Sequence, residues 1–245
     1  MNQYLHQGVE AWIVDLSDGA GVRPYAETLL AHQERERANR FRHENERERF
    51  ILTHAILREL LSQYLHVSPA TLDFTLGANG KPSLTHFPWL RFNLSHARDL
   101  AAFAFTSNCD LGIDIEAVRD VPQAAAIVSH FFCRGEQADL TRLEEHEFAQ
   151  AFYRTWVSKE AYLKAVGAGL SMPLNSFQVS VAANSTPRLL VTRNGDAHSW
   201  TLQSLPLESG YVGAIAYHDL SRTTCIQPRT TAANILTSAL TPRSY

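Results

Sequence analysis

Three short apolar segments, residues 90–94, 101–106 and 111–116, follow one another with very little chain between them. The linkers 95–99 and 107–110 are too short for the crossover of a dozen or more residues that parallel pairing requires. Short polar linkers between strand-like segments are typical of antiparallel neighbours. The sequence therefore predicts an antiparallel meander in the middle of the chain.

Helices and strands are expected on both sides of this meander. Helical spacing of apolar residues predicts helices over 26–65, with a charged stretch at 34–49, and over 123–132, 135–143 and 145–166. Further strands are expected at 11–15, 72–76, 177–181, 189–192, 200–205 and 211–216. This order predicts an α+β protein of two similar lobes, each a small antiparallel sheet packed with helices, at 1–111 and 112–220. Ser, Thr, Arg and Pro dominate residues 221–245, which predicts a loose tail.

Composition narrows the function classes. Hydrophobic residues make up 45% of the 245 and charged residues 19%, the mix of a soluble globular protein. The formal net charge of −3 argues against bulk binding to nucleic acid or another polyanion. No apolar run approaches the roughly 18 residues of a membrane span, and no signal peptide is visible. Three widely spaced cysteines form neither a disulfide framework nor a zinc motif, so a cytoplasmic location is expected.

The segment 111–116 carries two acids at alternate positions. Side chains two apart leave the same face of a strand, so Asp114 and Glu116 are predicted to point together, with Ile113 and Ile115 directed into a core. Paired carboxylates on one face suit a cation or an opposing base. A solvent-exposed polar face explains these two residues equally well.

A third acid lies in the helix predicted over 145–166. Glu160 and Lys164 are one helical turn apart on one face, with Trp156 one turn the other way. An ordinary surface Glu–Lys pair is the competing explanation. Three carboxylates from a strand and a helix would supply the oxygen ligands that Mg²⁺ prefers. A nearby lysine would suit phosphate-ester chemistry, but the spacing does not say which ester.

Three ordered segments resemble the signatures of one family, the 4′-phosphopantetheinyl transferases. They are Phe92-Asn-Leu-Ser-His96, Gly112-Ile-Asp-Ile-Glu116 and Trp156-Val-Ser-Lys-Glu160 followed by Lys164. The chain length is similar to that of the larger, monomeric type, which activates the carrier proteins of nonribosomal peptide and polyketide synthases. The resemblance extends over about residues 34–177 and implies two lobes related by a pseudo-twofold axis.

The resemblance implies a reaction and assigns residues to it. Asp114, Glu116 and Glu160 would hold Mg²⁺ together with the phosphates of coenzyme A (CoA), Glu116 either directly or through water. Glu160 would also act as general base for the serine hydroxyl of an apo acyl or peptidyl carrier protein. That oxygen would attack the β-phosphorus of CoA and release adenosine 3′,5′-bisphosphate. Lys164 would contact the transferred phosphate.

The same resemblance assigns the CoA contacts. His96 would contact a CoA phosphate, either the 3′-phosphate or the diphosphate, with help from Ser95, and is counted among the catalytic residues. Arg49 would bind the 3′-phosphate, with Arg37 as a second candidate. The segment Gly80-Lys81-Pro82 would place Lys81 and Pro82 near the adenine and phosphates. The alternative function is a metal-dependent phosphohydrolase that uses the same acids on a nucleotide or CoA-like ester.

Overall fold

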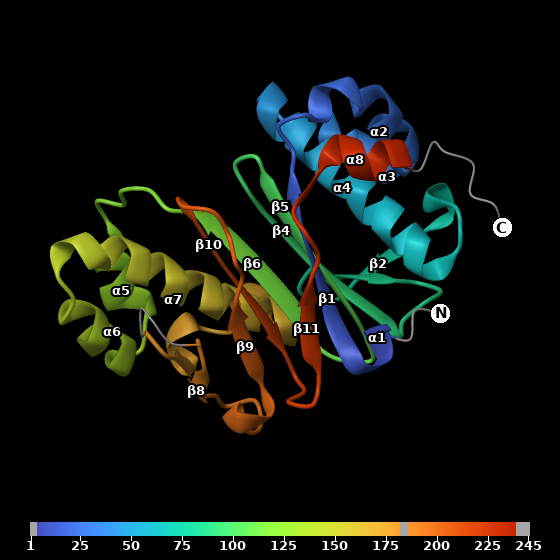
Figure 1. The fold of residues 1–245 in the computed structure, drawn as a ribbon. Helices are drawn as coiled ribbons and strands as arrows, with labels where there is room; N and C mark the ends of the chain where they lie inside the picture. The colour runs from blue at the N-terminus through green and yellow to red at the C-terminus, as the bar shows by residue number, and fades with distance from the viewer. Residues whose placement is uncertain (1–3, 182–185, 239–245) are drawn as a thin grey trace.

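Two β-sheets pack face to face and a layer of helices covers the outer face of each, in a computed structural model that describes residues 4–181 and 186–238 (Figure 1). The first sheet has the order β11–β1–β5–β4, with β12 also beside β1. Its strands are β1 (Gly8–Asp15), β4 (Leu90–Ala97), β5 (Leu100–Ser107), β11 (Thr223–Ile226) and β12 (Thr230–Thr231). The second sheet contains β6 (Leu111–Ala117), β10 (Tyr211–Tyr217) and β9 (Thr201–Ser204) in that order.

Each sheet carries one long helix of 22 residues, α4 (Glu44–Leu65) on the first and α7 (Glu145–Val166) on the second. The helices α2 (Arg23–Leu29), α3 (His32–Ala38) and α8 (Ala232–Ser238) accompany α4, whereas α1 (Tyr4–Gln7) lies at the start of β1 and contacts β1 and β5. The helices α5 (Ala124–Phe131) and α6 (Arg134–Thr141) accompany α7. Two small hairpins complete the described chain: β2 (Phe74–Leu76) with β3 (Pro82–Leu84), and β7 (Gln178–Val179) with β8 (Leu189–Val191).

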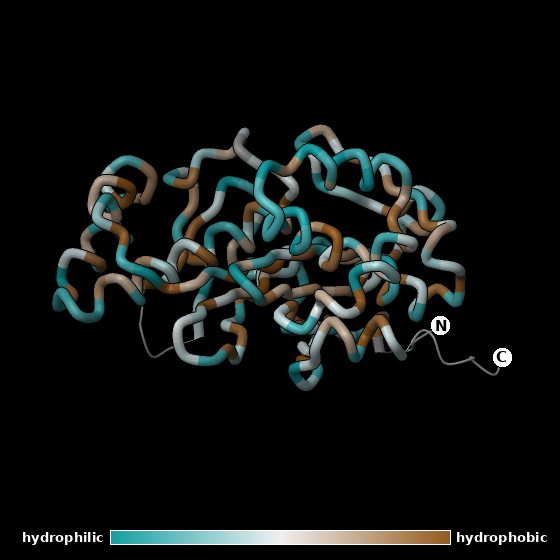
Figure 2. The backbone as a smooth tube through the Cα atoms, turned by 90° about the horizontal axis from the view of Figure 1, so that it is seen from above, coloured by the Kyte–Doolittle hydropathy of each residue, from teal (hydrophilic) through white to brown (hydrophobic). Residues whose placement is uncertain are grey.

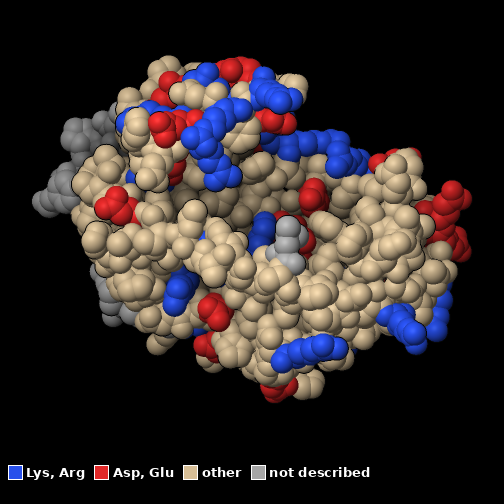
Figure 3. Space-filling view, turned by 180° about the vertical axis from the view of Figure 1, so that it is seen from behind, with Lys and Arg blue, Asp and Glu red and all other residues tan. Residues whose placement is uncertain are grey.

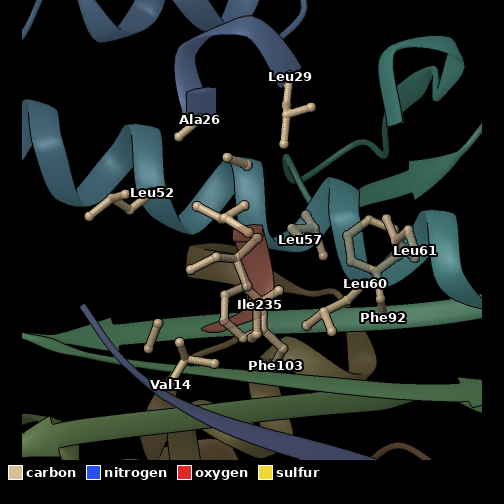
Figure 4. Packing of buried hydrophobic residues seen from close by; sticks show 14 of the residues in the cluster. Val14, Ala26, Leu29, Leu52, Leu57, Leu60, Leu61, Phe92, Phe103 and Ile235 are labelled. Carbon is tan, nitrogen blue, oxygen red and sulfur yellow. The ribbon is translucent and has the colours of Figure 1, made fainter. Parts of the chain in front are cut away.

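Apolar side chains fill three spaces between these layers. Figure 4 shows α4 laid across the first sheet, with Leu57 and Leu60 directed toward the strands that carry Phe92 and Phe103. Between the two sheets, Ala11 and Ala104 meet Ile113 and other residues of the second sheet. In Figure 2 the hydrophilic segments are concentrated on the outer turns, as expected for a protein with a buried central double sheet. Among the described helices, none has both the length and the apolarity needed to cross a bilayer.

The structure confirms the predicted α+β class and the bounds of α7, which ends at Gly167 in the left-handed conformation with φ of 71°. The helical stretch expected over 26–65 divides into α2, α3 and α4. The predicted meander is correct only for β4 and β5, which pair antiparallel. The third strand, β6, pairs with β10 in the second sheet, because β1 already occupies the free edge of β5.

The expectation of a loose tail from residue 221 is wrong for residues 221–238. The strand β11 runs parallel to β1, from Gly8↔Thr223 to Ala11↔Ile226, so the first sheet is mixed and not purely antiparallel. The helix α8 then packs its buried Ala232, Ile235 and Leu236 against the core beside α4. Residues 239–245 lie outside the described residues.

The helix α7 lies unusually close to β6 at Gly112. A Cβ atom built on Gly112 would lie 2.1 Å from the carbonyl oxygen of Ala161 and 2.4 Å from the backbone nitrogen of Ala165. Both neighbours are backbone atoms of α7, so no side-chain rotation would relieve the overlap. Only glycine permits this approach, which places the α7 residues after Ser158 directly over the acids of β6.

Replacing Ile235 with alanine tests whether α8 is an integral part of the fold. Ile235 is 4% exposed, so Ile235→Ala should lower the free energy of unfolding by about 2–5 kcal/mol. The control Asn234→Ala changes an exposed neighbour on the same helix and should have little effect. Urea denaturation measures both variants, and equal stabilities would show that α8 contributes no core.

A second substitution tests the close approach of α7 to β6. Gly112→Ala should lower the free energy of unfolding by about 1–3 kcal/mol, because the added methyl group overlaps the backbone of α7. Gly21→Ala is the matched control, since a Cβ atom there meets nothing within 4 Å. Denaturation curves that coincide for the two variants would refute the tight contact at Gly112.

Candidate functional site

The two acids of β6 point toward α7, on the face opposite the core between the sheets. Asp114 is 5% exposed and Glu116 is half-buried, whereas Ile113 and Ile115 are buried against the first sheet. The alternation predicted for this strand is therefore present. It places both carboxylates beneath the last turns of the helix that carries Glu160.

Asp114 is the centre of the hydrogen bonding at this site. Its Oδ1 atom accepts hydrogen bonds from Ser95 Oγ at 2.8 Å and from Lys164 Nζ at 2.7 Å. Lys164 Nζ also donates to the carbonyl oxygen of Ile113 at 3.2 Å. The second carboxylate oxygen, Oδ2, is buried and has no hydrogen-bond partner among the residues that the structure describes. A buried, unpaired carboxylate oxygen is costly, so this atom is poised to accept a ligand.

The two glutamates are electrostatically coupled to Asp114. Burial raises the pKa of Glu160, the charge of Asp114 raises it further, and Lys164 partly opposes both effects. Burial also raises the pKa of Glu116, and the negative charges of Asp114 and Glu160 add to that shift. The site therefore holds an excess of negative charge that Lys164 only partly neutralises. Within residues 4–181 and 186–238, no three His, Cys, Asp or Glu side chains already form a group that could hold a metal ion.

Side chains of β4 connect the first sheet to the acidic strand. Asn93 Oδ1 accepts a hydrogen bond from the backbone nitrogen of Ile113 at 2.8 Å, and Ser95 Oγ reaches Asp114. The expectation that Ser95 and His96 follow a strand at a turn is wrong. The ladder to β5 continues to Ala97↔Leu100, and the turn comes afterwards, with Arg98 at a φ of 50°.

His96 points away from Ser95, into a cavity of about 670 Å³ between α3, α4, β4 and the end of β6. Arg37, Arg49, His54 and Glu116 also line this cavity. Figure 3 shows the molecule hollowed on this side, with basic side chains gathered along the rim. The surrounding protein lowers the pKa of His96, and the charges of Lys164, Arg49 and His54 lower it further. The cavity therefore presents cations to an anionic ligand and ends at the acidic strand.

The predicted arginines are held in different ways. Arg49 Nη2 donates to Asp99 Oδ1 at 3.1 Å, an exposed ion pair that a phosphate could displace. The guanidinium of Arg37 lies 5.2 Å from the ring centroid of Phe50, in a cation–π contact. Both arginines thus reach the cavity from α3 and α4, as the sequence-based hypothesis requires.

Lys81 and Pro82 lie elsewhere, beside a smaller cavity of about 250 Å³. Lys81 Nζ donates to the carbonyl oxygens of Leu111 and Ala165, each at 2.9 Å. Burial lowers the pKa of Lys81 to about 8. This lysine therefore joins the start of β6 to the end of α7, and the structure does not bring it into the cavity lined by Arg37 and Arg49.

Sequence reasoning missed one buried ion pair behind the site. Lys159 Nζ donates to Glu136 Oε1 at 2.6 Å and to the carbonyl oxygen of Phe177 at 2.8 Å, with both charged side chains fully buried. The backbone nitrogen of Val179 donates to the same Glu136 oxygen at 2.8 Å. The helical spacing could have indicated that Lys159 is buried, because this position lies on the same apolar face of α7 as Tyr162. The pair fastens α7 to α6 and β7 and so fixes the direction of Glu160.

Comparisons with known proteins agree with the motif arrangement. Residues 24–108 match the model of the N-terminal domain of 4′-phosphopantetheinyl transferases, and residues 110–216 match that of the 4′-phosphopantetheinyl transferase superfamily. The junction between the two matches falls just before β6.

Curated relatives align over most of the chain. A putative 4′-phosphopantetheinyl transferase of Synechocystis is 32% identical over 188 residues, which cover 75% of each chain. The 4′-phosphopantetheinyl transferase HetI of Nostoc is 32% identical over 215 residues, which cover 86% of this chain and 88% of the relative. The 4′-phosphopantetheinyl transferase Sfp of Bacillus subtilis is 29% identical over 189 residues, which cover 77% and 82% respectively.

Proposed function

The chain belongs to the 4′-phosphopantetheinyl transferase superfamily, and on that premise we propose how its residues move phosphopantetheine from CoA to a carrier protein. Asp114, Glu116 and Glu160 hold Mg²⁺, and Glu160 accepts the proton of the carrier serine. The basic cavity over β4 holds the nucleotide end of CoA. The observation that carries this proposal is the buried, unpaired Oδ2 atom of Asp114, whose charge raises the pKa of both Glu116 and Glu160.

The donor set suits Mg²⁺. All three groups are carboxylates, which are the hard oxygen ligands that this ion prefers, and the mutual repulsion that raises the pKa of both glutamates would be relieved by a cation. Mg²⁺ is usually bound by one or two protein carboxylates, waters and substrate phosphates, so a complete protein cage is not required. When bound, the ion would neutralise charge on the phosphates of CoA. Glu116 contributes directly or through water.

Glu160 is suited to the role of general base. A carboxylate is an efficient proton acceptor near neutral pH only if its pKa lies above the usual value, and burial together with Asp114 raises the pKa of Glu160. The half-buried position on α7 leaves its side chain accessible beside the acidic strand. Glu160 takes the proton of the serine hydroxyl, directly or through one water, while that oxygen attacks the β-phosphorus. Adenosine 3′,5′-bisphosphate leaves.

The cationic groups orient the donor. Lys164, already hydrogen-bonded to Asp114 Oδ1, contacts the transferred phosphate, and His96 contacts a CoA phosphate from the cavity wall. Arg49 and Arg37 bind the terminal phosphate of the nucleotide, where a guanidinium can donate two hydrogen bonds. Ser95 holds the orientation of Asp114. The enzyme works as a cytoplasmic monomer and uses neither a membrane nor a nucleic acid.

The phosphohydrolase alternative finds no support, because the curated relatives described above are named transferases. The direct test is incubation with CoA, Mg²⁺ and an apo carrier protein, followed by mass spectrometry of the carrier. A mass gain of one phosphopantetheine unit on the carrier serine is expected, together with release of adenosine 3′,5′-bisphosphate. Hydrolysis of CoA, with every tested carrier left unmodified, would overturn the proposal.

Glu160→Gln should separate activity from stability. Transfer should fall by at least about 100-fold, because the base and a metal-ligand charge are lost. The unfolding free energy at pH 7 should rise, because the variant no longer buries a charge beside Asp114. Because the pKa of Glu160 is higher in the folded state than in the unfolded state, its ionisation destabilises the wild type above the folded-state pKa. Below the unfolded-state pKa, Glu160 is protonated in both states and has no such effect. The stability gain should therefore shrink as the pH falls through the raised pKa toward about 4.3.

Thermal unfolding with and without Mg²⁺ completes this experiment. Mg²⁺ should raise the melting temperature of the wild type more than that of Glu160→Gln, since a ligand stabilises the state that binds it. Asn175→Ala, an exposed change outside the site, is the matched control and should behave like the wild type. Near-normal transfer by Glu160→Gln would show that the assignment of the base is wrong.

A further inference from the structure

His54 forms part of the cavity wall but has no role in the reaction described above. It lies on α4, one helical turn after Phe50, and its side chain is 23% exposed. The ring centroids of His54 and Phe50 are 4.0 Å apart, and the Phe50 ring also carries the guanidinium of Arg37. Arg37, Arg49, His54 and His96 line the same cavity. The position of the histidine therefore places a titratable ring among the cations proposed to bind CoA.

Glu34 holds one nitrogen of this ring. The distance from His54 Nδ1 to Glu34 Oε1 is 2.9 Å. The other carboxylate oxygen accepts from Arg58 Nε at 2.7 Å and from the backbone nitrogen of Ala31 at 2.8 Å. Burial alone would raise the pKa of Glu34, but the hydrogen bond from His54 and the charge of Arg58 outweigh it and lower the pKa. An ionised Glu34 requires the proton of the contact to lie on Nδ1.

The opposite ring nitrogen remains available. His54 Nε2 has no hydrogen-bond partner within the described ranges, and its direction is fixed by the Glu34 contact and the Phe50 ring. Thr53, which also lines the cavity and is 1% exposed, has a buried Oγ1 atom without a partner among the described residues. Two adjacent polar groups without protein partners indicate a polar ligand at this end of the cavity.

The charges favour the terminal phosphate of the nucleotide as that ligand. The acids of β6 and Lys164 lie at the other end of the site, where the diphosphate must react. The charged groups around His54 and along the cavity are Glu34 and Arg37 from α3, Glu46, Arg49 and Arg58 from α4, His96 from β4 with Arg98 just after it, and Glu116 and Arg119 at the far end. With Nδ1 held by Glu34, Nε2 can donate to a phosphate oxygen only from the ring form in which both nitrogens carry a proton and both are donors.

We propose that His54, held by Glu34, binds the 3′-phosphate of CoA through Nε2 and thereby distinguishes CoA from its 3′-dephosphorylated form. The inference rests on the proposed function, because it takes CoA as the occupant of the cavity. His54 is a binding residue and takes no part in the transfer step. Glu34 is a positioning residue, since it acts on the phosphate only by orienting the ring.

Two amide substitutions separate the roles of the two ring nitrogens. Asparagine at position 54 can keep the hydrogen bond to Glu34 through an amide in place of Nδ1, but it has no group in place of Nε2. Glutamine extends an amide to about the position of Nε2. His54→Asn should therefore lose the phosphate contact, whereas His54→Gln should retain part of it.

Binding is measured by calorimetry without Mg²⁺, using adenosine 3′,5′-bisphosphate and adenosine 5′-monophosphate as probes. His54→Asn should weaken binding of the bisphosphate about tenfold or more, as expected for one lost hydrogen bond to a charged group, and leave the monophosphate unaffected. His54→Gln should lie between this variant and the wild type. In transfer assays, His54→Asn should raise KM for CoA, leave kcat unchanged, and leave KM for 3′-dephospho-CoA unchanged.

A purely structural role gives a different result. Equal weakening of both nucleotides by His54→Asn, or a loss that appears in kcat with both donors, would overturn the inference while wild-type transfer continues. Asn175→Ala, an exposed change outside the cavity, controls for handling and should match the wild type. If the wild type transfers nothing to any carrier, the failure lies with the proposed function and not with His54.

Discussion

The site depends on the close approach of α7 to β6, which Gly112 makes possible. Because no side chain separates the two backbones there, Lys164 reaches Asp114 with a hydrogen bond of 2.7 Å. Two further contacts hold the helix in this position. Lys81 joins its last turn to the start of β6, and the buried pair of Lys159 and Glu136 fastens its other side. The residues proposed to perform the chemistry are thus positioned by the backbone contact at Gly112 and by the buried lysines Lys81 and Lys159, which form their own hydrogen bonds outside the acidic site.

This packing also concentrates negative charge. Burial and the charge of Asp114 raise the pKa values of Glu116 and Glu160, and the cations Arg119 and Lys164 offset these shifts only in part. An isolated fold would be more stable without this arrangement, because buried like charges oppose folding. A cation and the phosphates of a substrate would convert the same repulsion into binding energy. Local instability at functional sites is expected where a sequence is selected for chemistry.

Local patterns in the sequence predict local structure well. The alternation in β6 and the apolar periodicity of α7 each depend on a few neighbouring residues, and both correspond to the structure. The C-terminal segment was misjudged because its composition is polar, while its structure comes from pairing with β1, more than 200 residues earlier. The strand predicted over 90–94 was too short, because its antiparallel pairing with β5 continues to Ala97↔Leu100 and so includes Ser95 and His96. The burial of Lys159 was not predicted, because this lysine belongs to the same sequence motif as Glu160.

The two ends of the candidate site come from different sheets with their covering helices, and contacts between the two sheets set the separation of those ends. The basic cavity is built on α3, α4 and β4, whereas the acids are carried by β6 and α7. Asn93 and Ser95 bind β4 directly to β6, and Arg229 Nη2 contacts Asp15 while its other amino group contacts Glu208. The strand β4 is shared by both ends, since Ser95 contacts Asp114 and His96 lines the cavity. Under the proposed function, the fixed spacing of the two sheets would therefore set the distance between the two phosphate sites.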